Sequence, residues 1–176
     1  TQPTRNFINL SVESIGVTIT SNLFTSSATG FFRYPKVIPL SNGNFSIFYL
    51  DPAVSTIFQQ EVTFTPSFGL VATPIATVPT ASPTSDFAIK LDVSGNGIIT
   101  FVKADKHVWV GNISNVTTIS SIFQVSSTTT DLRRNPEISF NPTSNKGMIV
   151  WEDFRDDSSS PKIYGRKIAK ATAFST

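Results

Sequence analysis

Apolar residues in this chain gather in short runs that are separated by turns rich in Gly, Pro and Asn. The clearest run, Met148 to Trp151, follows Gly147 and is closed by acidic residues. It is too short for a buried helix, and its residues suit a pleated surface. We therefore predict a strand that is buried on both faces and is reached through a hairpin turn at residues 141–147.

The same order of turn and apolar run occurs twice more. A turn near Asn42 precedes the apolar run 45–50, and a turn near Gly95 precedes the run 98–102. Each run is followed by a third predicted strand, and in these two units by a fourth. The last unit ends before a comparable fourth strand, so the copies are similar in order but not in length.

A period near 50 residues links these units. The residues that open them, Val37, Ile89 and Ile138, are 52 and 49 residues apart. Four short antiparallel strands in about 50 residues make one blade of a β-propeller. We predict a single all-β domain over residues 1–176 with a β-propeller-like fold of four-stranded blades, its units lying near 1–33, 34–85, 86–134 and 135–176.

A β-sandwich is the alternative fold, although a sandwich gives no reason for a repeat of this length. At about 50 residues per blade the chain makes roughly three and a half blades, whereas closed propellers have about four to eight. We therefore expect an incomplete propeller. It would be either the remainder of a longer chain or a protomer that self-associates, because open β-edges invite pairing.

Composition supports an all-β chain and excludes several classes of function. Ser and Thr make up about a quarter of the 176 residues, and there are 15 Phe and 11 Pro. Without cysteine the chain has no disulfide, thiol nucleophile or cysteine-bound zinc. Charged residues are 15% of the chain with a net charge of +2, so no nucleic acid partner is expected. The apolar runs are too short to predict a membrane span.

The last unit carries three segments that resemble a known repeat. They are Asn-Pro-Glu-Ile at 135–138, Gly-Met-Ile-Val-Trp-Glu-Asp-Phe-Arg at 147–155 and Ile-Tyr-Gly at 163–165. The pattern resembles the tandem repeats of secreted and cell-surface propeller-like proteins. In the middle unit Lys103-Ala104-Asp105 stands where Glu-Asp would be. The resemblance implies a propeller architecture and an extracellular or cell-surface location.

One acid follows the apolar run in each of the three units, and the repeat predicts that the three positions are equivalent. They are Asp51, Asp105 and Asp153. Paired carboxylates do general acid and base work in glycosidases and sialidases. A group repeated once per blade is better explained by a structural task, namely accepting backbone N–H bonds in the turn. We therefore predict no catalytic residues.

The predicted ligand-binding residues are Trp109, Asp153, Arg155 and Asp157. Trp109 has polar neighbours and could stack on a sugar, although packing between blades is the competing interpretation. The acidic loop around Arg155 offers several oxygens, so calcium is the one cofactor considered, although an Arg to Asp pair explains the loop better. His107 is the only histidine, so no metal site or catalytic triad is predicted.

Four sequons mark candidate glycosylation sites, which fits an extracellular or cell-surface protein. They begin at Asn9, Asn44, Asn112 and Asn115.

From the sequence we expect a non-enzymatic extracellular binding or interaction module that presents blade loops to a glycan or protein. A structural subunit of a filament, sheath or viral appendage, assembled through β-edges, is one alternative. A glycoside-processing enzyme is the other.

Overall fold

The computed structural model describes residues 9–14, 17–22, 33–52, 54–64, 70–72, 76–78, 83–92, 94–116, 118–127, 131–141, 143–144 and 146–169. These residues form strands and turns without a helix, which confirms the all-β prediction. Within this part of the chain, nothing helical is present that could cross a bilayer.

The strands form one short hairpin and three antiparallel sheets. The hairpin pairs β1 (Asn9–Ser14) with β2 (Val17–Asn22). The first sheet, called the first blade here, has the order β3-β4-β5-β6, and β7 also pairs with β5. Its strands are β3 (Arg33–Pro39), β4 (Phe45–Asp51), β5 (Thr56–Phe64), β6 (Leu70–Ala72) and β7 (Ala76–Val78).

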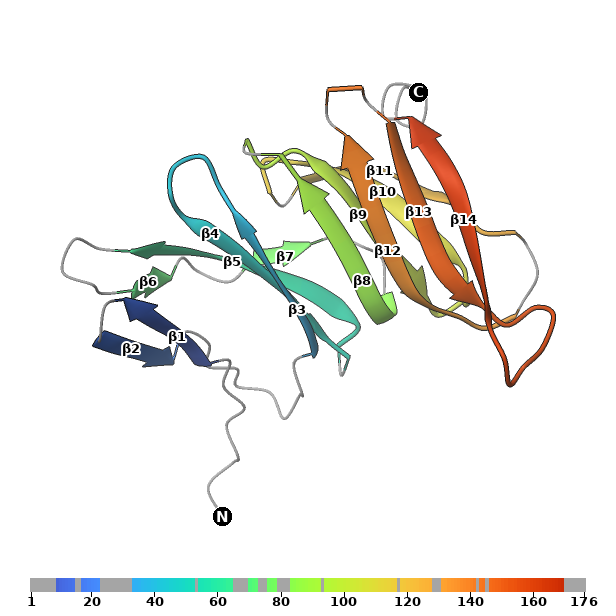
Figure 1. Ribbon diagram of the computed structural model, residues 1–176, viewed down its shortest axis with the longest axis horizontal. Coiled ribbons are helices and arrows are strands. Elements are labelled where there is room, and N and C mark those ends of the chain that lie inside the picture. The colour runs from blue at the N-terminus through green and yellow to red at the C-terminus, as the bar shows by residue number, and fades with distance from the viewer. Residues whose placement is uncertain are drawn as a thin grey trace, which may run out of the picture.

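The second and third blades follow in the same way. The second blade comprises β8 (Pro83–Leu91), β9 (Gly97–Lys103), β10 (Val108–Ser114) and β11 (Thr118–Gln124), and the third comprises β12 (Arg133–Asn141), β13 (Lys146–Asp153) and β14 (Lys162–Ala169). The first strand of the second blade, β8, contacts the first strands of both other blades, β3 and β12. The three sheets therefore stand side by side like successive blades, with their first strands adjacent (Figure 1).

Strand ends show which residues of the three blades are equivalent. The second strands β4, β9 and β13 end at Asp51, Lys103 and Asp153. Each of these strands has an isoleucine four residues before its end and an aromatic residue two residues before its end. The isoleucines are Ile47, Ile99 and Ile149, and the aromatic residues are Tyr49, Phe101 and Trp151, all buried.

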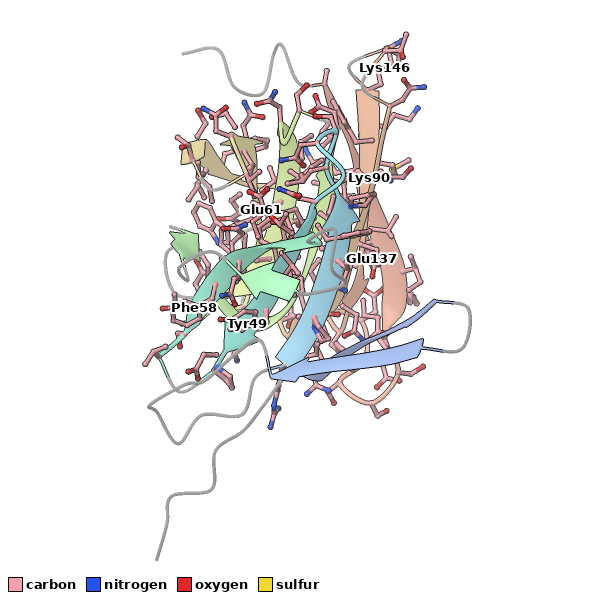
Figure 2. All side chains as sticks on the ribbon, turned by 90° about the vertical axis from the view of Figure 1, so that its left-hand side faces the viewer. Tyr49, Phe58, Glu61, Lys90, Glu137 and Lys146 are labelled. Atoms are coloured by element: carbon pink, nitrogen blue, oxygen red, sulfur yellow. The ribbon has the colours of Figure 1, made fainter. Side chains whose placement is uncertain are left out.

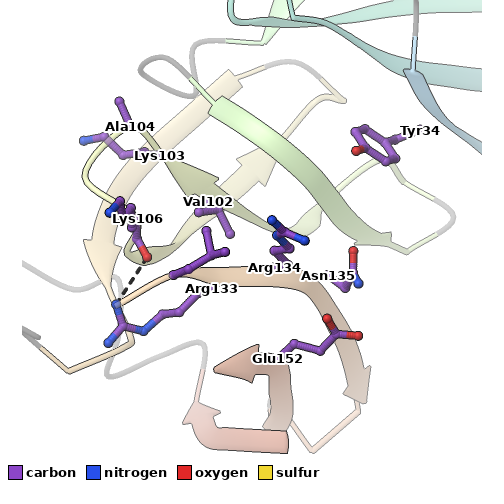
Figure 3. A pocket seen from close by; sticks show the side chains of 10 residues that line it. Tyr34, Val102, Lys103, Ala104, Lys106, Arg133, Arg134, Asn135 and Glu152 are labelled. Carbon is purple, nitrogen blue, oxygen red and sulfur yellow. Dashed lines mark hydrogen bonds between the residues drawn. The ribbon is translucent and has the colours of Figure 1, made fainter. Parts of the chain in front are cut away.

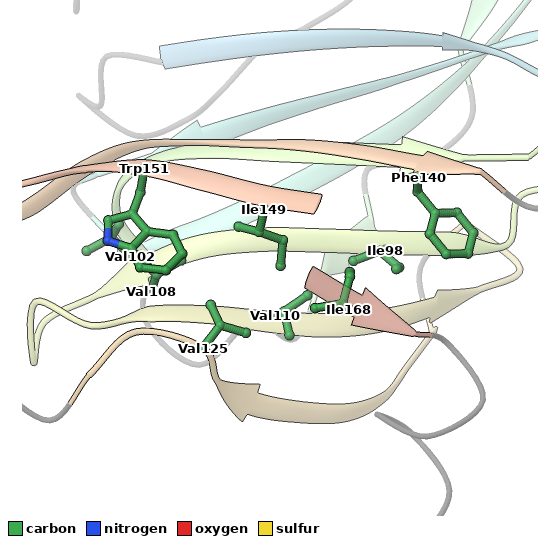
Figure 4. Packing of buried hydrophobic residues seen from close by; sticks show 9 residues of the cluster. All are labelled: Ile98, Val102, Val108, Val110, Val125, Phe140, Ile149, Trp151 and Ile168. Atoms are coloured by element: carbon green, nitrogen blue, oxygen red, sulfur yellow. The ribbon is translucent and has the colours of Figure 1, made fainter. Parts of the chain in front are cut away.

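Apolar residues pack between neighbouring blades rather than inside one sheet. Phe48 and Leu50 of the first blade meet Ile99 and Phe101 of the second in one cluster. On the opposite face of β9, Ile98 and Val102 pack with residues of the third blade, including Ile149, Trp151 and Phe140 (Figure 4). The strand β9 is thus buried on both faces, as expected for the middle layer of three.

The first blade carries a further aromatic contact across two neighbouring strands. The rings of Tyr49 and Phe58 stack with their centroids 5.7 Å apart (Figure 2).

The structure corrects two details of the sequence analysis. The run from Met148 to Trp151 is buried on one face only, because Met148 is 40% exposed while Ile149 and Trp151 are buried. No further sheet covers the Met148 face among the described residues. The Pro-, Thr- and Ser-rich residues 77–85 predict a connection between the first two units, but strands occupy both of its ends, because β7 extends to Val78 and β8 begins at Pro83.

Candidate functional site

The first strands of the blades share an irregularity near their starts. Register shifts interrupt β3 between Arg33 and Lys36, β8 between Pro83 and Phe87, and β12 between Arg134 and Glu137. The three strands run in similar directions (Figure 1), so the irregularities lie at one end of the molecule. Bulges of this kind redirect side chains and are frequent beside active sites.

Two of these bulges hold a strained residue between an arginine and a proline. Tyr34 has φ 58° and stands between Arg33 and Pro35, and Asn135 has φ 50° in the corresponding segment of β12. A residue with a side chain at positive φ costs of the order of 1–3 kcal/mol, and such residues cluster at functional sites. The two arginines, Arg33 and Arg134, are both exposed.

A pocket of about 620 Å³ opens at this end (Figure 3). It is bordered by the starts of β3 and β12, the end of β13 and the turn between β9 and β10. The side chains that matter for its chemistry are three cations, one carboxylate and two neutral polar groups: Lys103, Lys106, Arg134, Glu152, Tyr34 and Asn135. The Lys103 ammonium lies 4.0 Å from the Trp109 ring centre, which leaves Lys106 and Arg134 as the cations for a ligand with negative charge.

A second carboxylate lies on the same face of the third blade as Glu152. Glu137 pairs with Val150 across the β12 and β13 ladder, and Glu152 is two residues beyond Val150. Diagonal neighbours of this kind are roughly 7–8 Å apart. This spacing separates the strand positions and not the carboxylate oxygens, and Glu137 does not line the pocket.

Lys36 links the first strands electrostatically. Its ammonium lies 3.6 Å from Asp86 of β8 and 4.0 Å from Glu137 of β12. Partly exposed pairs of this kind add little stability. Their effect is to place the Lys36 cation between the first strands of the second and third blades.

Asp153 lies beneath the pocket in a hydrogen-bonded network. Its carboxylate accepts bonds from Arg133 Nε at 3.0 Å, from Trp151 Nε1 at 3.0 Å and from the backbone N–H of Arg155 at 3.1 Å. The Arg155 guanidinium is a further donor. Burial alone would raise the pKa of Asp153, but the bonds from Arg155 and Trp151 and the charge of Arg133 hold that pKa well below its usual range.

The loop between β13 and β14 does not gather its carboxylates. Asp157 accepts bonds from the backbone N–H and hydroxyl of Ser159, and Asp156 binds Lys162 and the Tyr164 hydroxyl. In the part of the chain that the structure describes, no three His, Cys, Asp or Glu side chains gather as metal ligands. Asp153 turns inward to its arginines and so is held apart from Asp156 and Asp157.

The four predicted ligand-binding residues do not form one site. Asp153 and Arg155 are in contact, and Arg155 also lies 4.0 Å over the Tyr164 ring. Asp157 faces Ser159 instead. Trp109 lies apart from them, with the Lys103 ammonium 4.0 Å from its ring centre.

The acid of the middle unit is not equivalent to the other two. Asp51 and Asp153 end their strands and are buried, whereas β9 ends at Lys103 and Asp105 is exposed in the following turn. Asp105 accepts bonds from the His107 N–H and from Trp109 Nε1. The β9–β10 connection is a tight turn, so the acid falls within the turn rather than on the strand.

The candidate sequons differ in environment. Asn44 is half-buried and donates to Glu61, Asn112 is half-buried in β10, and Asn115 is exposed. Asn9 lies in β1, and its side chain is outside the described residues.

Sequence reasoning missed the cationic residues of the pocket and Glu152. Only Arg134 had a signal, namely the Arg-x-Pro segment that occurs near the start of both β3 and β12 at residues 33–35 and 134–136. Lys106 had no signal, because it reaches the pocket through contacts between blades.

Comparison with known proteins identifies the fold. No family model and no curated protein matches this sequence. An intramolecular trans-sialidase from Ruminococcus gnavus, solved with oseltamivir carboxylate, matches at a TM-score of 0.57 and 9% identity, over 90% of this chain and 37% of that one.

Two further solved structures match in the same way. An α-L-arabinofuranosidase from Fusarium graminearum matches at a TM-score of 0.52 and 10% identity, over 79% of this chain and 45% of its own. An exo-β-1,3-galactanase from Phanerochaete chrysosporium matches at 0.53 and 9% identity, over 93% of this chain and 43% of its own. This chain therefore spans less than half the length of these structures.

These likenesses contradict our main expectation of function. We expected a non-enzymatic binding module, yet the solved structures that share the fold are enzymes that process glycosides. The sequence argument weighed only the repeated acids Asp51, Asp105 and Asp153 as a catalytic set and did not consider Glu137, which is exposed, or Glu152, which is half-buried. At this identity the likeness establishes that the chain has the β-propeller-like fold of these enzymes.

Proposed function

We propose that this chain forms the sugar site of a glycoside-processing β-propeller that acts on an acidic sugar. The observation that carries the proposal is the pocket at the start of the first strands, which Lys106, Arg134 and Glu152 line together. A ligand that fits both features has a carboxylate for the cations and a glycosidic bond for the acid.

The cations would bind the acidic group of the sugar. Arg134 carries a planar guanidinium that can bind a carboxylate through two parallel hydrogen bonds. Lys106 is exposed at the opposite wall and supplies a second positive charge. Tyr34 and Asn135, held at positive φ, border the same pocket and offer polar groups to sugar hydroxyls.

The two glutamates would carry the reaction. In an inverting glycosidase one carboxylic acid protonates the leaving oxygen and the other carboxylate activates a water on the opposite face of the sugar. Glu137, 4.0 Å from the Lys36 ammonium, has the role of the carboxylate that accepts a proton from water. Glu152 then has the role of the acid that protonates the leaving oxygen.

The test is hydrolysis of a panel of fluorogenic glycosides. We expect turnover of 4-methylumbelliferyl α-N-acetylneuraminide or β-glucuronide at least ten-fold faster than that of the α-L-arabinofuranoside or β-galactoside. Glu152→Gln should lower kcat about 100-fold or more, as loss of a general acid does. Glu61→Gln is the matched control, because Glu61 bonds Asn42 in the first blade. Turnover confined to the neutral glycosides, or undiminished in Glu152→Gln, contradicts the proposal.

An extracellular or cell-surface location is part of the same proposal. It is supported by the exposed sequon at Asn115 and by the fold shared with sialidases.

A further inference from the structure

Arg133 is a buried cation next to the pocket, and the proposed reaction does not use it. It is the first residue of β12, and its side chain has 0% exposure. Its neighbour Arg134 is exposed in the pocket, so the two adjacent arginines face different surroundings. Burying a guanidinium is costly unless every donor has a partner, so its contacts show what it is held against.

The contacts of Arg133 join three parts of the chain. Nε donates to Asp153 of β13 at 3.0 Å, and Nη2 donates to the Ser127 hydroxyl at 3.1 Å. Nη1 reaches the Asp131 carbonyl at 3.1 Å and the Lys106 carbonyl at 3.2 Å, the latter shown by the dashed line in Figure 3. Ser127 and Asp131 precede β12, whereas Lys106 belongs to the second blade.

The second contact with the β9–β10 turn is His107, whose Nδ1 lies 3.1 Å from Arg133 Nη1. A guanidinium can only donate, so Nδ1 accepts and the imidazole hydrogen is on Nε2. Arg133 therefore holds this turn at two consecutive residues. The same turn supplies Lys103 and Lys106 to the pocket.

The repeat itself does not require an arginine at this position. Arg133 pairs with Asp153 at the end of β13, and the equivalent pair in the second blade is Pro83 with Lys103 at the end of β9. The second blade is thus built with a proline there. A buried arginine found at the pocket, and absent from the equivalent place of the neighbouring blade, has a task that belongs to the pocket.

We propose that Arg133 is a positioning residue that clamps the β9–β10 turn of the second blade onto the third blade, and so sets the distance between Lys106 and Arg134 for an acidic sugar. This inference rests on the proposed function. Its physical basis is that the planar guanidinium holds its donors on separate nitrogens, so Nε reaches Asp153 while Nη1 reaches the Lys106 carbonyl and His107, whereas the three donors of an ammonium are on one nitrogen.

The test compares Arg133→Lys with the intact chain in two measurements. Glucuronate and glucose, which differ only in the carboxylate, serve as probes of binding by calorimetry. We expect Arg133→Lys to weaken glucuronate binding at least ten-fold and to change glucose binding less than two-fold. Amide hydrogen exchange should become at least ten-fold faster at Lys106 and His107, while the amides of β13 keep their rates.

Arg166→Lys is the matched control. Arg166 also donates from the third blade to the second, to the Val125 carbonyl at 3.1 Å, but outside the pocket. It should leave glucuronate binding unchanged. If Arg133→Lys fails to fold, His107→Ala removes one acceptor of the clamp, keeps the Arg133 pair with Asp153, and should shift both measurements in the same direction.

The outcomes separate the two proposals. If the intact chain binds neither sugar, the proposed function fails, and the exchange measurement still decides whether Arg133 holds the turn. If glucuronate binding is unchanged in Arg133→Lys and His107→Ala, or if exchange at Lys106 and His107 is unchanged, the positioning role of Arg133 is refuted.

Discussion

At the scale of single residues, Arg133 and Asp153 form a buried ion pair. Both side chains have 0% exposure and lie 3.0 Å apart. Two opposite charges in this position recover their desolvation cost only through good geometry and further hydrogen bonds. Trp151 and Arg155 supply such bonds to Asp153, so the carboxylate is well satisfied while it is charged.

Asp153→Asn should destabilise the fold strongly. It leaves the Arg133 charge buried without its partner, a change that typically costs about 3–5 kcal/mol. Denaturant unfolding at pH 7 measures the loss. Asp157→Asn is the control, because Asp157 is exposed, and it should leave the unfolding curve nearly unchanged. Equal curves for the two variants would show that the pair contributes nothing.

The acid range gives a second check on the same residue. The folded-state pKa of Asp153 lies below its unfolded value of about 3.9. Its stabilisation is therefore fully present above the unfolded value and is lost as pH falls through about 4 toward the folded-state pKa. The intact chain should lose unfolding free energy over this range more steeply than Asp153→Asn, which cannot titrate there. Parallel pH profiles would contradict the assignment.

At the scale of elements, the hairpin turns of the first two blades are built alike. In the first, the Leu40 N–H donates to the Asn44 carbonyl at 2.8 Å and the Gly43 N–H donates to the Leu40 carbonyl at 3.1 Å. Asp92, Asn96 and Gly95 repeat this pattern in the second blade. Both glycines have positive φ, at 81° and 78°. The turn chemistry is local, but the surroundings of the two glycines differ.

Gly95→Ala should cost more than Gly43→Ala. An added Cβ at Gly43 meets nothing within 4 Å, whereas at Gly95 it would lie 2.6 Å from Val116 Cγ2. Both variants bear the left-handed backbone cost of about 1–2 kcal/mol. Only Gly95→Ala adds overpacking, typically about 1–3 kcal/mol. Denaturant unfolding of both variants measures the difference, and equal losses would show that Val116 moves aside freely.

At the scale of the whole molecule, the blades differ in which faces are covered. Ile98 in β9 is buried against the third blade, and Met148 occupies the equivalent place in β13, five residues before the strand end. Met148 is 40% exposed, whereas Ile98 is fully buried. The same position in the repeat therefore contributes to the core in one blade and to the surface in the next.

The two positions should respond differently to truncation. Ile98→Ala should cost about 2–5 kcal/mol, as deletion of a buried aliphatic side chain does. Met148→Ala should cost about 0.5 kcal/mol or less, as substitutions on a surface do. Thermal and denaturant unfolding of both variants provide the comparison. A large loss in Met148→Ala would mean that its face is covered in solution.

The sequence determined the local architecture because its causes are local. Runs such as Phe45 to Leu50 are too short and apolar for anything but strands, and Gly43 and Gly95 provide the positive φ that the turns need. The period of Val37, Ile89 and Ile138 then predicted repeated sheets. These features depend on neighbours within a few residues, so no knowledge of distant contacts was needed.

Only the tertiary structure decided the site. Lys106 reaches the pocket because Arg133, 27 residues later, holds its carbonyl, and Glu152 becomes a pocket carboxylate because β12 and β13 end beside that turn. Met148 is likewise exposed because, among the described residues, no further sheet covers its face of the third blade. Contacts between blades join residues far apart along the chain, and periodicity within one strand carries no information about them.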